Sequence, residues 1–392
     1  MSNKYNYCGP PGLNLKQILG IERQPRSVKS WFDSDTVYYI HTARTGIMHI
    51  CTLLDLKKGC EVLVPAYNVG AELDPLIKNG IQVSLYRIDR SGVADIPDII
   101  SRITSKTRAI YATHYFGFPQ KVDDIKLICD QYNLYLIEDC ALSLFSKHGE
   151  KKIGSVGDVS IFSLTKTLPL PDGGVLIINN EKLKKVTWNL HPPEKRRVLR
   201  KLLPLIKSSV MRRASVYKST NPLSTYFLKM DAKRRISKIY NDLSASTNKP
   251  TMAPDQYYYE FLTNRHISAV SDFLLGAFDI DNIITKRRRN FSLLQSLLIN
   301  CGAESLFKNL PEGVCPLHFP VIVKNRDHIQ RELYKRNIYT GAWWKGYYED
   351  LDWNDYPEAC YLKDNVLTLP VHHDLDDKNI ESIAENLIEL IG

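Results

Sequence analysis

The sequence predicts an α/β fold with a mostly parallel central sheet and helices on both of its faces. Short apolar, β-branched runs alternate with segments of helical periodicity between residues 36 and 180. With 392 residues the chain exceeds the usual size of one domain. We therefore expect an N-terminal arm over residues 1–35, a large domain over 36–300 and a smaller α+β domain over 301–392.

The first half of the chain reads as regularly alternating strands and helices. The expected strands are, in order, VYYI, EVLVP, QVSLYRI, RAIYATH, LYLIE and VLII. A helix is expected after the first strand, with Ile47, Ile50, Cys51 and Leu54 facing the core. Two more are expected at 96–103 and 122–132, and the last has Val122, Ile125, Cys129 and Tyr132 on one apolar face.

The second half predicts a long helix near residue 280, followed by the smaller domain. There CPLHFPVIV reads as a strand and NRDHIQRELYKRNI as a helix capped by Asn325. The stretch YTGAWWKGYYED is unusually aromatic, and Trp343 and Trp344 are either walls of a substrate pocket or core. The last helix places Ile380, Ile383, Ala384, Leu387 and Ile391 on one face.

Two strands of the expected sheet bring an acid and an amine to neighbouring loops. LYLIE ends at Asp139, and Ser163 and Lys166 stand in an S-x-x-K spacing before the glycine pair 173–174. Ligands of open α/β sheets bind at such strand ends. Pyridoxal phosphate (PLP) catalysis needs a lysine for the Schiff base, an aspartate to keep the pyridine nitrogen protonated and a hydroxyl for the phosphate. From spacing alone an accidental S-x-x-K and a helix-capping aspartate remain open.

Four segments carry a resemblance to a known family. VLVPAYNVGAELDPLIKNG, THYFGFPQKVDDI, LIEDCALSLFS and GSVGDVSIFSLTKTLPLPDGG resemble the DegT/DnrJ/EryC1/StrS family of PLP-dependent sugar aminotransferases, in the order and spacing of that family. The resemblance covers roughly residues 38–185 and 258–392. It implies fold type I, the fold of aspartate aminotransferase, with Lys166 as the cofactor lysine, Asp139 at the pyridine nitrogen and Ser163 at the phosphate.

The resemblance also implies that three further residues contact the phosphate. Where the family has S-G-T-A-A, this chain has T-A-R-T-G, at the start of an expected helix whose free N–H groups favour anions. In this position Arg44 would supply a positive charge to the phosphate and Thr45 a hydroxyl. Alternatively, Thr45 caps the helix and Arg44 is solvated. Asn264 matches an asparagine that reaches the partner's cofactor phosphate in relatives, which implies a homodimer with shared active sites. The competing interpretation makes Asn264 a helix N-cap.

Three positions depart from the family pattern or carry a second interpretation. Where the family stacks an aromatic ring on the cofactor this chain has Val69, so either Tyr67 supplies the ring or an aliphatic side chain covers that face. Leu142 replaces the glutamine or histidine that follows the aspartate in relatives, and it cannot hydrogen-bond a ligand. His114 either lines the cofactor pocket or is a buried, hydrogen-bonded core histidine.

The net charge of +9 comes from one segment. Residues 181–240 hold 17 Lys and Arg against three Asp and Glu, so the rest of the chain is net negative. We expect a basic helical insertion over about 186–255, broken into two short helices at Pro204. The first interpretation of this insertion is a helix that packs on its own protein. The alternatives are that residues 195–218 contact an anionic membrane, or that the segment attracts an anionic nucleotide-sugar. Nucleic-acid binding is not expected, because no recognised module accompanies the charge.

The remaining composition indicates a cytoplasmic protein. The eight cysteines show no C-x-x-C pair or metal-ligand spacing and are expected as thiols, with no metal site. No apolar run approaches the about 20 residues that cross a bilayer, and the N-terminal residues lack a signal-peptide pattern. The basic segment leaves a peripheral position at the inner membrane surface open.

The expected function is transfer of an amino group to the keto sugar of a nucleotide-sugar, in surface-glycan (lipopolysaccharide) or antibiotic sugar biosynthesis, with glutamate as the implied donor. A PLP-dependent sugar dehydratase is the rival enzyme, although relatives that dehydrate replace the lysine with histidine. A non-catalytic scaffold of the same fold, attached to membranes through the basic segment, is the rival from another class.

Overall fold

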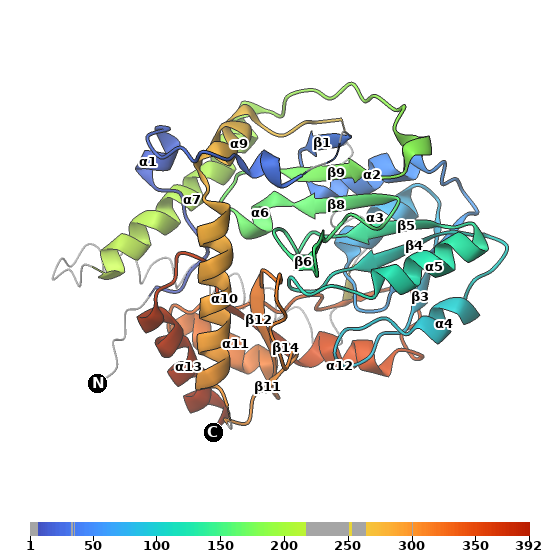
Figure 1. Cartoon of the computed structure of the whole chain (residues 1–392). Helices are drawn as coiled ribbons and strands as arrows, with labels where there is room; N and C mark the ends of the chain where they lie inside the picture. The colour runs from blue at the N-terminus through green and yellow to red at the C-terminus, as the bar shows by residue number, and fades with distance from the viewer. Residues whose placement is uncertain (1–6, 33, 35, 217–250, 253–263, 300) are drawn as a thin grey trace.

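The computed structural model describes residues 7–32, 34, 36–216, 251–252, 264–299 and 301–392 (Figure 1). Its central sheet has seven strands in the order β1-β9-β8-β5-β4-β2-β3. Neighbours from β3 through β2, β4 and β5 to β8 are parallel, and β9 runs antiparallel to both β8 and β1. The predicted mostly parallel sheet is confirmed. The strands are β1 Val37–Ile40, β2 Glu61–Pro65, β3 Gln82–Tyr86, β4 Thr107–Thr113, β5 Tyr135–Asp139, β8 Val159–Ser163 and β9 Gly174–Ile178.

Helices cover both faces of this sheet (Figure 1). α2 (Ala43–Leu53) and α3 (Gly70–Lys78) lie together, as do α4 (Ile96–Ser101) and α5 (Val122–Tyr132). The apolar face of α5 buries Val122, Ile125 and Cys129 as expected. Tyr132 was wrongly placed on that face: it is the last residue of the helix and is 41% exposed, whereas Ile128 is buried.

The C-terminal part of the chain forms a second, antiparallel sheet with its own helices. Strands β11 (Glu304–Ser305), β12 (His318–Ile322) and β14 (Val366–Pro370) pair in that order. The helices are α10 (Ile280–Leu297), α11 (Arg326–Lys335), α12 (Pro357–Asn365) and α13 (Asp377–Ile391). α13 packs against α10 and α11, and its predicted apolar face buries Ile380, Ile383, Ala384 and Leu387. Asn325 precedes α11 as expected, but its side chain makes no capping hydrogen bond because its backbone is left-handed.

The two sheets share one continuous core that contains side chains of both, among them Ile137 and Leu369. The exact domain boundaries stay a prediction. None of the eight cysteines forms a disulfide. The shorter elements are α1 Leu15–Ile18, η1 Val28–Trp31, β6 Lys147–His148, β7 Lys151–Lys152, α6 Leu164–Thr167, η2 Glu181–Leu183, β10 Thr251–Met252, α9 Ala269–Leu274, η4 Leu275–Ala277 and β13 Tyr347–Tyr348.

The basic segment begins with one long helix, α7 (Lys195–Val216), and not with two short ones. Pro204 lies inside it, on an exposed side of the helix together with Arg200. Pro204 has no N–H to donate to the carbonyl of Arg200, and because both residues are exposed, water can replace the lost donor and lower the cost of an interior proline. Contacts on the other side support the helix: Leu13 donates its N–H to the carbonyl of Leu205, and Ser208 donates its hydroxyl to the carbonyl of Pro10. Residues 217–250 of the expected insertion lie outside the described residues.

Among the described residues, no helix combines the length and the apolar character that a membrane span requires.

Candidate active site

Two adjacent strand ends bring Asp139 and Lys166 to the same place. β5 ends at Asp139, which stands beside Ile161 of β8. β8 ends two residues later and leads directly into the short helix α6, which carries Lys166. The carboxyl edge of the sheet therefore positions both side chains, as parallel strands are expected to do.

Lys166 lies in a site that disfavours its charge. Burial lowers the pKa of its amine and Arg44 lowers it further, whereas the nearby carboxylates Asp139 and Glu72 act in the opposite direction. Its Nζ lies 4.9 Å from the centre of the Trp343 ring. A neutral amine is therefore accessible at this position nearer to neutral pH than on an exposed lysine.

The carboxylate of Asp139 is held by two hydrogen bonds. Its Oδ2 accepts the hydroxyl of Tyr111 at 2.7 Å, and its Oδ1 accepts the N–H of Ala141 at 2.8 Å. Both donors belong to the same region of the sheet, since Tyr111 lies on the neighbouring strand β4. The acid therefore has one fixed orientation at the strand end.

The predicted phosphate residues lie close to this edge but differ in how they are engaged. Ser163 is buried at the end of β8, with its hydroxyl 3.3 Å from that of Thr165. Thr45 forms a capping box with Thr42 at the start of α2, where its hydroxyl donates to the Thr42 carbonyl at 2.7 Å. Arg44 is close enough to Lys166 to affect its charge. The alternative role of Thr45, helix capping, is thus present in the structure, and phosphate binding by these residues stays a prediction.

The glycine pair after the lysine brings α2 against the sheet. A Cβ on Gly174 would lie 2.5 Å from the backbone of Thr42 and Ala43. Gly173 has φ +140° and donates its N–H to the carbonyl of His41. Only glycine permits this approach, so the lysine loop and the helix start lie side by side.

The loop after β2 does not present Tyr67 as an exposed ring. Tyr67 is fully buried, its ring lies 4.8 Å from that of Trp344 and 5.2 Å from that of Tyr115, and its hydroxyl donates to the Trp343 carbonyl. Val69 is half-buried and Leu142 is buried. In the structure Tyr67 is therefore part of an aromatic cluster between the two sheets, and its cofactor role stays a prediction.

Asn264 lies exposed before α9, and its carbonyl accepts the N–H of His191. It is not the N-cap of that helix, because Ser268 caps α9 with its side chain. The helix-capping interpretation of Asn264 is therefore wrong. Its expected contact with a partner subunit stays a prediction.

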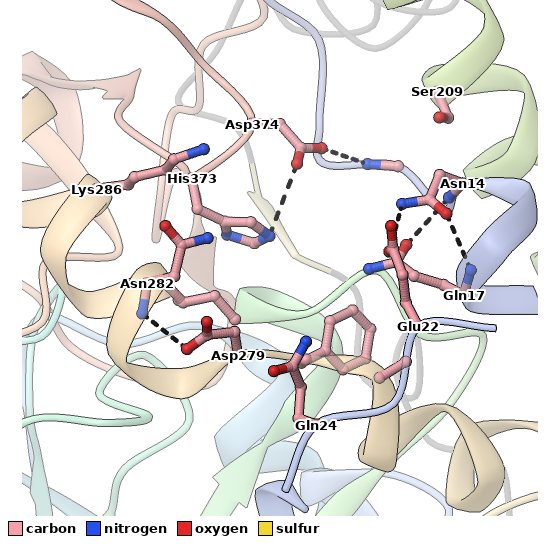
Figure 2. A pocket seen from close by; sticks show the side chains of 14 residues that line it. Asn14, Gln17, Glu22, Gln24, Ser209, Asp279, Asn282, Lys286, His373 and Asp374 are labelled. Carbon is pink, nitrogen blue, oxygen red and sulfur yellow. Dashed lines mark hydrogen bonds and ion pairs between the residues drawn. The ribbon is translucent and has the colours of Figure 1, made fainter. Parts of the chain in front are cut away.

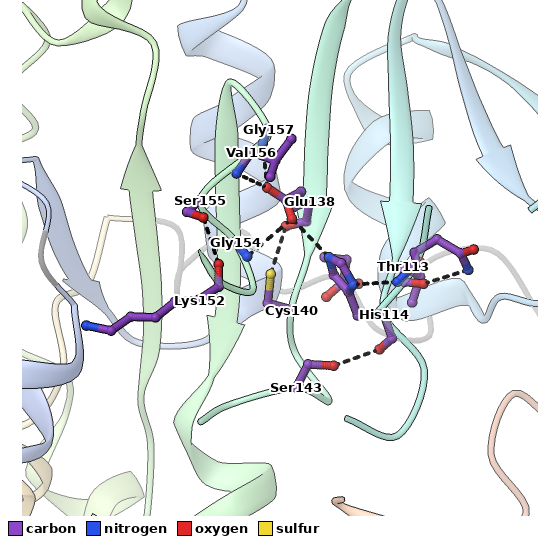
Figure 3. Close-up of polar contacts among 12 residues, drawn as sticks. Thr113, His114, Glu138, Cys140, Ser143, Lys152, Gly154, Ser155, Val156 and Gly157 are labelled. Carbon is purple, nitrogen blue, oxygen red and sulfur yellow. Dashed lines mark hydrogen bonds and ion pairs between the residues drawn. The ribbon is translucent and has the colours of Figure 1, made fainter. Parts of the chain in front are cut away.

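His114 belongs to a buried network behind the strand ends (Figure 3). Its Nδ1 accepts the N–H of Gln120 at 3.0 Å, so Nε2 carries the proton and donates to Glu138 at 3.0 Å. Glu138 also accepts N–H groups of Gly154, Val156 and Gly157. Because Glu138 precedes Asp139 on the same strand, the two carboxylates point to opposite faces of the sheet.

The same network includes three residue types that bind metals, His114, Glu138 and Cys140. The lone pairs of the histidine and the carboxylate already accept hydrogen bonds from the backbone. The cluster is therefore explained as a structural hydrogen-bond network, as the second interpretation of His114 expected.

A cavity of about 290 Å³ adjoins Lys166 and Thr165. Its lining is mostly apolar and comes from the N-terminal segment, α7, α11 and the second sheet. The polar groups there include His318 and the buried Arg287, which donates to the carbonyls of Pro316, Leu317 and Thr167. Burial lowers the pKa of His318 to about 3, so that imidazole is neutral.

A second, more polar cavity of about 390 Å³ lies between the N-terminal segment, α7 and α10 (Figure 2). Many polar groups around it are paired with one another: Asn14 donates to Glu22, Asp279 caps α10 at Asn282, and Asp374 accepts the N–H of Gly12. The bond between Gly12 and Asp374 attaches the N-terminal segment to the C-terminal part of the chain. The segment thereby becomes a wall of the cavity at Lys166, which Pro10 and Pro11 line.

Sequence reasoning missed Glu72, Tyr111, Arg287 and His318. Tyr111 and His318 are polar side chains of apolar strands, which is the one signal that singles them out. Glu72 looks like an ordinary acid at a helix start and Arg287 stands in a run of basic residues, so no local signal marks these two. Glu72 is buried in the first turn of α3, where its Oε1 accepts the indole N–H of Trp344 and its Oε2 accepts the N–H of Val69, both at 2.9 Å. Burial raises its pKa, and the nearby Asp139 adds to this.

The fold is that of known aminotransferases. The aminotransferase PseC of Helicobacter pylori, involved in the biosynthesis of pseudoaminic acid, superposes with a TM-score of 0.69 at 14% identity over 99% of this chain and 98% of its own. The PLP form of a putative sugar aminotransferase from Streptococcus pneumoniae gives 0.66 at 16% identity, over 98% of each chain. The chain therefore has the fold type I architecture of these aminotransferases, with Lys166 and Asp139 at adjacent strand ends.

The sequence narrows this class to one family. The model of the DegT/DnrJ/EryC1/StrS aminotransferase family matches residues 35–200 and 277–388, so the chain belongs to that family. GDP-perosamine synthase of Vibrio cholerae is 30% identical over 141 residues, which are 35% of this chain and 38% of that protein. The match thus spans well under half the length of this relative.

Proposed function

We propose that this protein is a PLP-dependent aminotransferase that moves an amino group, with glutamate as donor, onto the keto sugar of a nucleotide-sugar. The observation that carries the proposal is the placement of Lys166 and Asp139 at adjacent strand ends beside a cavity. Membership of the aminotransferase family supports it. Lys166 also favours amino transfer over dehydration, for which relatives use histidine.

The residues present fit PLP. Lys166 would hold the cofactor through its amine, Asp139 would pair with the pyridine nitrogen, and Ser163 and Arg44 would contact the phosphate. When bound, PLP supplies an electron-withdrawing ring that stabilises negative charge on the substrate carbon. The fixed carboxylate of Asp139, which accepts hydrogen bonds from Tyr111 and Ala141, suits a group that must remain aimed at one ring atom.

The chain's own residues account for proton movement and exclusion of water. Burial lowers the pKa of Lys166, so its Nζ gives up and takes back a proton more readily than the amine of an exposed lysine does. Pro10, Pro11, Leu168 and Leu205 give the cavity beside this atom an apolar lining, which favours exclusion of water once a substrate fills it. His318, being neutral, adds no positive charge that would further depress protonation of the amine.

A sugar linked to a nucleotide fits the name of one relative, GDP-perosamine synthase, and an aminotransferase of similar fold is involved in the biosynthesis of pseudoaminic acid. Both are connected with amino sugars. We extend only this shared chemistry, a ketone on a sugar ring that receives an amine, to the present chain.

Colour and its loss test the proposal. Purified protein reconstituted with PLP is expected to absorb visible light, and added glutamate should remove that absorption as the amino group moves to the cofactor. Protein that stays colourless with PLP would exclude both enzyme functions. Protein that binds PLP but responds to no amino acid would leave a dehydratase or a scaffold.

We propose further that the active protein is a homodimer in which Asn264 of each subunit reaches the partner's site. Its exposed position, away from α9, supports this assignment. A solution mass equal to one chain at micromolar concentration, measured by light scattering on active protein, would contradict it.

We also propose that the protein is cytoplasmic and contacts an anionic membrane surface through the exposed face of α7. Leu199, Leu203 and Val210 are 56%, 58% and 59% exposed, and Arg196, Arg200 and Lys207 are exposed beside them. Changing these three cations to serine is expected to weaken binding to phosphatidylserine vesicles about a hundredfold, at about 1 kcal/mol per charge. Pelleting at low and high salt measures this. The control variant changes Lys151, Lys182 and Lys308 to serine and should bind the vesicles as tightly as wild-type protein does. If the changes in α7 leave vesicle binding unaffected, the proposed membrane contact is wrong.

A further inference from the structure

An aromatic segment of the C-terminal part, residues 341–348, lies against Lys166. The backbone of Gly341 exchanges hydrogen bonds with Thr368 of β14 at 3.0 and 2.8 Å, which attaches the segment to the second sheet. Two residues later, the ring of Trp343 lies 4.9 Å from Nζ of Lys166 and 5.6 Å from the ring of His318. The indole of Trp343 is therefore close to both the amine of Lys166 and the second sheet.

Glu72 attaches the segment to the start of α3, a helix of the large domain. Its carboxylate accepts the indole N–H of Trp344 and, through its other oxygen, the N–H of Val69. Trp344 is buried with its backbone in the left-handed region, φ +54°. A tryptophan adopts this conformation at a cost, so surrounding contacts must hold it there.

Further contacts hold the same residues. The Trp344 ring lies 4.8 Å from that of Tyr67 and 5.0 Å from that of Tyr115. Lys363 is buried and donates to the carbonyls of Asn68 at 2.6 Å, Gly346 at 3.0 Å and Trp344 at 3.2 Å. Because the backbone turns at Trp344, fixing this residue also fixes the direction of Trp343.

We propose that Trp343 is the aromatic partner of Lys166 and that Glu72 positions it through Trp344. The indole face stabilises the ammonium form of the lysine and bounds the space in which the amine moves. Glu72 is a positioning residue in this arrangement, since its hydrogen bonds go to Trp344 and to the backbone. This inference rests on the proposed function, because it assigns the two residues to the site that captures PLP.

The first test follows the pH dependence of PLP capture by the cofactor-free protein, measured by absorbance and by borohydride labelling of Lys166. Loss of a cation–π contact lowers the pKa of an amine, whereas entry of water into a loosened site raises it. Trp343→Leu is therefore expected to move the midpoint of capture down by about half a pH unit or more. Trp343→Phe should restore part of the shift. A midpoint that is unchanged or moves up overturns the role of Trp343.

Trp188→Leu is the matched control, because Trp188 packs on Tyr38 and His49 and has no ring contact with Lys166 among those the structure describes. It should leave the midpoint in place. If Trp343→Leu does not fold, Trp343→Phe is compared with Trp188→Phe instead. Trp343→Phe should lower the midpoint of capture by a smaller amount, and Trp188→Phe should leave it in place. Wild-type protein that captures no PLP at Lys166 would instead refute the proposed function itself.

A double-variant cycle tests Glu72. At a pH above the midpoint of capture, where the amine is neutral in every variant, Glu72→Leu is expected to weaken PLP binding about five- to tenfold because the wall of the site is displaced. Trp343→Leu should have a similar effect for the same reason, and the double variant should be no weaker than the weaker single one. Glu72→Gln keeps an acceptor for Trp344 and should retain most of the affinity. Effects of the two leucine substitutions that multiply would show that Glu72 acts independently of Trp343 and would overturn its positioning role.

Discussion

Lys166→Ala is expected to abolish covalent capture of PLP and to lower amino transfer by about four orders of magnitude, the upper range for loss of a positioned acid–base group. Among the described residues, the half-buried Lys166 is the lysine whose amine lies near both Asp139 and the cavity at the strand ends. Single-turnover absorbance with glutamate measures the loss. Lys335→Ala, at an exposed lysine paired with Glu332, should retain full capture.

A second lysine with a lowered pKa, Lys363, serves as an internal control for this prediction. Burial also lowers the pKa of Lys363, to about 7, so an easily deprotonated amine exists at a second buried position. However, its Nζ donates to three carbonyl oxygens, and those contacts leave it no room to react. Mass spectrometry after borohydride reduction should find the label on Lys166; a label on Lys363 would contradict the assignment of the cofactor lysine.

Glu138→Gln is expected to lower the free energy of unfolding by about 3 kcal/mol, whereas the adjacent Asp139→Asn should cost about 1 kcal/mol and lower turnover about a hundredfold or more. Glu138 accepts hydrogen bonds from His114, Gly154, Val156 and Gly157 in a buried site. An amide presents N–H groups to some of these donors, which leaves buried partners unsatisfied. Urea unfolding without PLP measures the first effect and steady-state assays the second.

This pair of variants separates structure from chemistry on one strand. If Glu138→Gln is as stable as wild type, the network around His114 does not support the sheet edge. If Asp139→Asn keeps normal turnover, the assignment of Asp139 to the pyridine nitrogen is wrong. Glu138 is expected to affect stability and Asp139 turnover, because successive side chains along β5 point to opposite faces of the sheet.

Several site features were beyond sequence reasoning for identifiable reasons. Trp343 was recognised as aromatic, but its contact with Lys166 depends on how the second sheet docks on the first. Glu72 looks like an ordinary acidic residue in the first turn of a helix, a position that favours carboxylates. Its burial and its bond to Trp344 involve partners far apart in the chain. Pro204 predicted a helix break by a local rule, yet packing of α7 on the N-terminal segment kept one helix.

By itself, the sequence determined the order and type of the main strands and helices, and it placed Asp139 and Lys166 after two strands of one sheet. These features are readable because periodicity and strand ends are local properties of the chain. Only the tertiary structure decided what surrounds the amine: the indole of Trp343, the carboxylate of Glu72 that holds its neighbour, and the cavity walled by the N-terminal segment and α7. Such contacts join distant segments through burial and shape, and no local pattern encodes them.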